Sequence, residues 1–216
     1  MLLLITRYRF LSLFIILLTF SLFKAVNTQF GWFNINGLIF GILTASSLLI
    51  IGHKERSVFY LITTIVFIYL FLLILKHYFN ESTINSLRFL IIIVFLILMT
   101  TLCLYFTLKD KTISVTTLFG SLSSYLFIGF VFAYIYLFIE SLSPMSFSQL
   151  STTQETQAIY FSFITLTTVG YGEIVPLKPI AQTLVWFEAF TGQSYLALII
   201  GQLIGRYVAE QKPNKD

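Results

Sequence analysis

The chain has 216 residues, of which 57% are hydrophobic and only 10% are charged. Its mean hydropathy of +0.91 lies outside the range of soluble globular domains. The formal net charge of +4 comes from basic residues that are scattered along the chain, which argues against a basic surface for nucleic acid. Composition therefore predicts an integral membrane protein that binds membrane lipid and no nucleic acid.

Apolar runs bounded by charge mark the candidate membrane spans, because a bilayer core about 30 Å thick requires about 20 residues of helix. Six runs qualify, and the first two are the shortest: residues 10–23, 36–51, 58–75, 89–108, 117–139 and 179–207. A further apolar stretch, residues 158–167, has about half the spanning length. It predicts a re-entrant helix that enters the membrane and turns back.

The first run also fits a secretory signal peptide, because Arg7 and Arg9 precede about 14 apolar residues. The run leads into FKAVNT without a clear small-x-small cleavage site, which favours an uncleaved anchor. Cleavage would remove one helix and leave the orientation of the others unchanged.

The distribution of Lys and Arg predicts the orientation, because these residues accumulate on the cytoplasmic side. With the amino terminus inside, nine of the 13 basic residues lie at inner ends, and the outer ends hold Lys24, Lys76, Arg88 and Lys178. We therefore expect both termini to be cytoplasmic and residues 140–178 to lie outside. The polar residues 141–157 then predict a solvated outer loop, and the cell membrane is the expected location.

Residues 163–173 read FITLTTVGYGE and place hydroxyls and two glycines between long apolar runs. Because glycine tolerates positive φ, Gly170 and Gly172 allow successive carbonyls to turn toward one side of an extended segment. Non-helical backbone is tolerated at membrane depth only inside protein or beside a watery cavity. The carbonyls of Thr168 through Tyr171, with the Thr168 hydroxyl, then form a column of oxygens. Closing this column into a cage requires several chains.

Residues 168–172, Thr-Val-Gly-Tyr-Gly, resemble the selectivity filter of the potassium-channel family, in which four such loops replace the hydration shell of K⁺. The resemblance extends over about residues 115–210, since Ser162, Thr165 and Thr167 match hydroxyl positions of that family's pore helix. Pro176 and the apolar run after it also match the family's layout.

The resemblance implies an all-α membrane protein that assembles as a homotetramer. Each chain would have six transmembrane helices, with a re-entrant pore helix and selectivity filter between the fifth and the sixth. Residues 1–111 would form a four-helix amino-terminal membrane domain, and residues 112–216 would form the pore domain.

The resemblance also assigns roles to individual residues. The filter residues are Thr168, Val169, Gly170, Tyr171 and Gly172, of which the first four would coordinate K⁺. The residues expected to support the filter are Tyr160, Phe161, Thr167 and Glu173, with a hypothetical hydrogen bond from Tyr160 to Glu173. The residues expected to line the pore are Gln193, Leu196, Ile200 and Ile204, although ordinary helix packing explains the two isoleucines nearly as well.

The roles of two further residues in the last apolar run, Gly192 and Glu188, each have two possible interpretations. Gly192 lies where the family's inner helix often carries a gating hinge, which we favour over simple close contact between helices. Glu188 is a carboxylic acid inside a membrane helix, where it must face protein or water. It is either a proton-sensitive or structural contact behind the filter, or a neutral hydrogen-bonded acid in the tetramer interior.

The fourth run has Arg88 at one end, Lys109 at the other and no charge between them. Steep voltage sensitivity needs several charges within the membrane, so we expect little intrinsic voltage dependence. The predicted function is passive, K⁺-selective conduction without a cofactor. The alternatives are a weakly selective cation channel, a non-conducting channel-like subunit and a membrane receptor. An enzyme is not expected, because His53 and His77 fall on opposite sides of the membrane and no catalytic motif is recognised.

Overall fold

The computed structural model describes residues 2–31, 56–75, 81–109 and 115–211. Its helices in this part of the chain are α1 (Leu2–Phe30), α3 (Arg56–Leu75), α4 (Glu81–Lys109), α5 (Val115–Leu142), α6 (Glu155–Leu166) and α7 (Pro179–Gln211). The predicted span 36–51 lies outside the described residues, as do His53 and His77. Within these residues the regular secondary structure is helical apart from one isolated bridge, Phe147 to Pro176, which confirms the all-α class.

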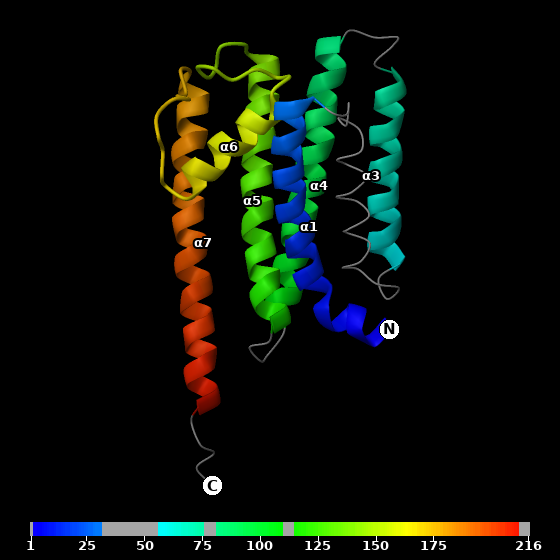
Figure 1. The fold of residues 1–216 in the computed structure, drawn as a ribbon, viewed down its shortest axis with the longest axis vertical. Coiled ribbons are helices and arrows are strands. Elements are labelled where there is room, and N and C mark those ends of the chain that lie inside the picture. Colours follow the sequence, from blue (N-terminus) through cyan, green and yellow to red (C-terminus); the bar gives the residue numbers. More distant parts are fainter. Residues whose placement is uncertain (1, 32–55, 76–80, 110–114, 212–216) are drawn as a thin grey trace.

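Helix α5 forms the centre of the fold. Helices α4, α1 and α6 all pack against it, and α3 packs against α4. Figure 1 shows α6 as a short, tilted helix in the upper half of the view, between α7 and α5. The start of α1 and the end of α7 both lie toward the lower end. The buried aromatic residues Phe127, Phe130 and Tyr136 of α5 contribute to the core that supports α6.

Three of the described helices contain stretches long and apolar enough to cross a membrane: Phe10–Phe30, Thr83–Lys109 and Thr117–Leu142. The apolar part of α3, Phe59–Leu75, is shorter. These stretches confirm a helical membrane protein, and the count of six spans stays a prediction.

The helices of the structure extend beyond several of the predicted apolar runs. Helix α1 begins at Leu2 instead of residue 10, and α4 begins at Glu81 instead of residue 89. Helix α6 begins at Glu155 instead of residue 158. Polar residues continue a helix readily, and an acidic residue in the first turn is favoured by the helix dipole. Hydropathy alone therefore cuts such helices short.

The connection after α5, predicted to be a solvated outer loop, is exposed or half-buried over most of its length and is also held by hydrogen bonds. The Glu140 carboxylate accepts hydrogen bonds from the backbone N–H groups of Met145, Ser146 and Phe147, at 2.6, 3.0 and 3.2 Å. Phe147 is buried, and the N–H of Ser148 donates to the Val175 carbonyl at 2.9 Å. This connection is thereby tied to the segment that precedes α7.

Candidate functional site

The motif 168–172 begins directly at the carboxyl end of α6. After the helix ends at Leu166, the N–H of Val169 donates to the Ile164 carbonyl at 2.8 Å, and the N–H of Thr168 donates to the Thr165 carbonyl at 2.9 Å. These two bonds form a Schellman motif with Thr168 at the left-handed position, φ 60°. A threonine there stores strain of roughly 1 kcal/mol, and such strain concentrates at functional sites.

The backbone of the motif alternates in handedness. Gly170 and Gly172 have φ values of 50° and 91°, so with Thr168 every second residue is left-handed. The glycines meet the sequence prediction, whereas the left-handed Thr168 was missed because threonine rarely adopts this conformation. The side chains of Val169 and Tyr171 between them are 52% and 73% exposed. A single chain therefore leaves this segment uncovered.

The carboxyl end of α6 is held from two sides. Tyr125 of α5 donates its hydroxyl to the Leu166 carbonyl at 3.2 Å, which satisfies a carbonyl that has no partner inside the helix. Gly192 of α7 lies so close to the same carbonyl that an added Cβ would collide with it. Gln193 donates its side-chain N–H to the Thr168 hydroxyl at 3.3 Å.

This placement gives Gly192 a close contact between helices, the less favoured of our two interpretations. Helix α7 runs without interruption through Gly192. The hinge role of this residue stays a prediction.

A buried polar network fixes the middle of α6. Glu188 of α7 is fully buried, and its two carboxyl oxygens contact the hydroxyls of Tyr136 on α5 and Ser162 on α6. Ser162 also donates to the Gly129 carbonyl at 2.6 Å. Glu188 therefore joins α5, α6 and α7. Its acidity and burial were visible in the sequence, but its partners were not.

The residues predicted to support the filter lie around α6. Tyr160 is 42% exposed, and a side-chain hydrogen bond with Glu173 raises the pKa of Tyr160 to about 12, as expected for the predicted contact. Phe161 is buried against the rings of Tyr136 and Phe147, with centroids 5.3 and 5.7 Å away. Thr167 donates to the carbonyl at residue 163, at 2.7 Å. Their function as filter supports stays a prediction.

The predicted pore-lining residues on α7 are exposed wherever the structure describes their side chains. Gln193 is exposed, and Leu196 and Ile204 are 37% and 58% exposed. The side chain of Ile200 lies outside the described part of the chain. Exposure in the single chain agrees with a pore or with a helix interface, so their role stays a prediction.

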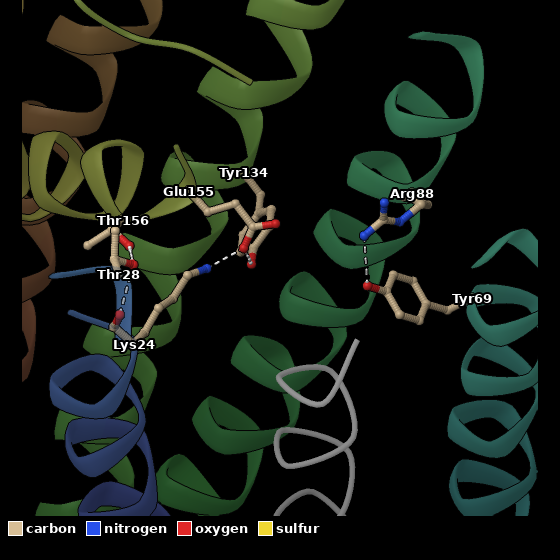
Figure 2. A network of polar contacts seen from close by, with 7 residues as sticks. All are labelled: Lys24, Thr28, Tyr69, Arg88, Tyr134, Glu155 and Thr156. Carbon is tan, nitrogen blue, oxygen red and sulfur yellow. Dashed lines mark hydrogen bonds and ion pairs between the residues drawn. The ribbon is translucent and has the colours of Figure 1, made fainter. Parts of the chain in front are cut away.

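The sequence places Lys24 at the outer end of the first apolar run, and in the structure the helix continues beyond it to Phe30. Lys24 lies inside α1, is 7% exposed and forms an ion pair with Glu155 in the first turn of α6 (Figure 2). A lysine within an apolar helix needs an acidic partner, so the sequence could have predicted that Lys24 pairs with an acidic residue. It did not identify Glu155 among the acidic residues near the outer ends.

Comparisons with known proteins bear on the same region. A family model described as an ion channel matches residues 92–209, more than half of the chain, beginning within α4. The chain is similar to the inward rectifier potassium channel Kirbac3.1 of Paramagnetospirillum magnetotacticum, at 37% identity over 87 residues. It is also similar to potassium channel subfamily K member 4 of Rattus norvegicus, at 40% identity over 60 residues. Member 17 of the same subfamily, from Homo sapiens, is 32% identical over 72 residues.

These similarities are partial. They cover 38%, 25% and 30% of this chain, and 27%, 15% and 22% of the respective relatives. The chain thus spans less than a third of the length of these curated relatives. No solved structure matches it.

Proposed function

Because the chain belongs to the ion channel family whose model matches residues 92–209, we propose that it conducts K⁺ passively and selectively across the membrane. The chain is an integral membrane protein and a channel, not an enzyme. Potassium channels need no cofactor, and K⁺ is the ion that they transport. The relatives in three organisms are named potassium channels, which supports K⁺ as the ion here.

One observation carries the proposal: the backbone of residues 168–172 alternates in handedness directly after a capped half-length helix. Such alternation allows the carbonyls to turn toward one side, where they replace the water around a dehydrated ion. The end of α6 also contributes partial negative charge, which favours a cation near the motif. The carbonyls of Thr168, Val169, Gly170 and Tyr171 are the proposed K⁺ ligands.

The proposed pore is formed by four identical chains. One chain supplies one column of oxygens, and the resemblance to potassium-channel filters implies four columns. The exposure of Val169 and Tyr171 in the single chain supports burial by other copies, because non-helical backbone at membrane depth must be buried in protein or line a watery cavity. Gly192 as hinge and Leu196, Ile200 and Ile204 as pore lining belong to the same proposal.

The proposed topology places both termini on the cytoplasmic side of the cell membrane. Helix α1 starts and α7 ends toward the same end of the molecule, which supports this arrangement (Figure 1). Helix α6 lies toward the other end, where the motif would face the outside. Residues 112–216 form the proposed pore domain, and α1 and α4 pack against its helix α5.

Ion flux into liposomes that contain the purified protein tests this function. We expect K⁺ flux through the wild type and its loss in Gly170→Ala, because alanine does not tolerate the left-handed conformation that the motif requires. Gly31→Ala is the matched control, since Gly31 has a similar φ of 65° outside the motif and open space around it. The control should retain the flux.

Two other results would contradict the proposal. Equal K⁺ and Na⁺ flux through the wild type would favour a weakly selective cation channel. Absence of any flux from correctly inserted protein would favour a non-conducting subunit or a receptor.

A further inference from the structure

A buried charge pair joins α1 to the first turn of α6. Figure 2 shows the Lys24 ammonium reaching Glu155, whose side chain also accepts a hydrogen bond from the Tyr134 hydroxyl at 3.2 Å. The side chains of Lys24 and Glu155 are only 8% and 14% exposed. The hydroxyls of Thr28 and Thr156 meet at 2.8 Å one turn further along α1. Two polar contacts therefore fix the amino-terminal turn of α6 to α1.

An aromatic contact runs parallel to these polar ones. The ring of Phe20 on α1 lies 6.0 Å from that of Phe130 on α5, which lies 5.4 Å from that of Phe163 on α6. Gly129 leaves room for Phe163, because a Cβ at that position would lie 2.8 Å from its ring. Helix α1 thus contacts α6 directly at the helix start and through α5 near the helix end.

Helix α6 is short enough to transmit displacement at one end to the other. Its 12 residues span about 18 Å, and its last turn continues into residues 168–172 through the two Schellman hydrogen bonds. The contacts at its middle and end come from α5 and α7, within the residues that match the ion channel family. The direct contacts of its first turn with α1 come from outside that match.

We propose that α1 is a positioning element of the pore: the Lys24–Glu155 pair holds the start of α6 and thereby keeps residues 168–172 in the conducting arrangement. The proposal rests on the function proposed above. Lys24 and Glu155 act as positioning residues, because neither touches the motif. A buried ion pair suits this role, since removal of one partner leaves an uncompensated charge and removal of both does not.

A double-mutant cycle in single-channel recordings tests the proposal. We expect Lys24→Met and Glu155→Gln each to lower the open probability by about tenfold, while the current through an open channel stays unchanged. The double variant should recover much of the open probability, because it removes both charges. Lys109→Met is the matched control, since the Lys109 ammonium contacts only the exposed Tyr105 among the described residues.

The outcomes separate this proposal from the proposed function. Unaltered open probability in both single variants, or effects that simply multiply in the double variant, would overturn the role of α1 while K⁺ conduction stands. Absence of K⁺ current in the wild type would instead contradict the proposed function. If the wild type carries no current, or if a single variant does not assemble, thermal melting in detergent tests the coupling between Lys24 and Glu155. The proteins compared are the wild type, the two single variants and the double variant. Additive shifts in Tm would overturn it.

Discussion

Ser162 carries one hydroxyl proton, yet its oxygen lies within hydrogen-bonding reach of two acceptors. These are the Gly129 carbonyl at 2.6 Å and a carboxyl oxygen of Glu188. If Ser162 donates to Gly129, a proton on Glu188 must supply the hydrogen bond between the two side chains. Tyr136 donates to the other carboxyl oxygen. Every contact is satisfied when Glu188 is a neutral acid, the second interpretation that we offered from the sequence.

This proton count predicts the result of two substitutions at Glu188. The amide of Glu188→Gln can donate to Ser162 and accept from Tyr136, so the free energy of unfolding of this variant should lie within about 1 kcal/mol of the wild type. Glu188→Ala leaves the hydroxyls of Tyr136 and Ser162 without the carboxyl group, and should lower the free energy of unfolding by about 2–4 kcal/mol. Thermal melting in detergent measures both values.

The pH dependence of single-channel current provides the decisive comparison at this residue. Wild type and Glu188→Gln should give matching curves. Curves that diverge would show that Glu188 changes its protonation state, and would make it a proton sensor.

At the scale of helices, the contact of α7 with the end of α6 requires the absence of a side chain at residue 192. An added Cβ would collide with the Leu166 carbonyl and lie 3.0 Å from the Leu166 side chain. Gly192→Ala should therefore push the helices apart and destabilise the protein by about 1–3 kcal/mol. Gly201→Ala is the control on the same helix, because nothing lies within 4 Å of its added Cβ. Thermal melting compares the two.

A different pattern would favour the hinge. In that case Gly192→Ala would leave the melting temperature unchanged and lower the open probability in recordings. Such a result would contradict close packing as the reason for glycine at this position.

The lack of charged residues in the apolar part of α4 predicts weak voltage dependence. Its apolar part has no charge between Arg88 and Lys109, and Arg88 donates to the Tyr69 hydroxyl at 3.3 Å near the helix start. Each charge that crosses the membrane field contributes about 2.3 kcal/mol per 100 mV, so this helix cannot drive steep opening. We expect a shallow conductance–voltage curve in liposomes, and a steep one would contradict this account of α4.

The sequence predicted contacts between neighbouring residues better than contacts between helices. Gly170 and Gly172 indicated a left-handed backbone because the requirement for glycine is local. Glu188 was recognised as a buried acid, but Tyr136 lies 52 residues away, and Glu155 lies 131 residues from Lys24. Such pairings depend on which helix faces meet. An apolar run does not specify this, because lipid and protein both accept apolar side chains.

At the scale of the molecule, one chain displays a motif that it does not enclose. Residues 167–173 are exposed, whereas the helix before them is mostly buried on α5. Backbone carbonyls that bind an ion at membrane depth need protein around them. The single chain thus supplies one wall of the proposed pore, and identical copies would supply the others.

The reversal potential of the wild-type protein in liposomes tests K⁺ selectivity most directly. Under opposed K⁺ and Na⁺ gradients, the account predicts that the reversal potential follows K⁺ and shifts by about 59 mV for each tenfold change in its gradient. A reversal potential near zero, or one that follows Na⁺, would contradict it.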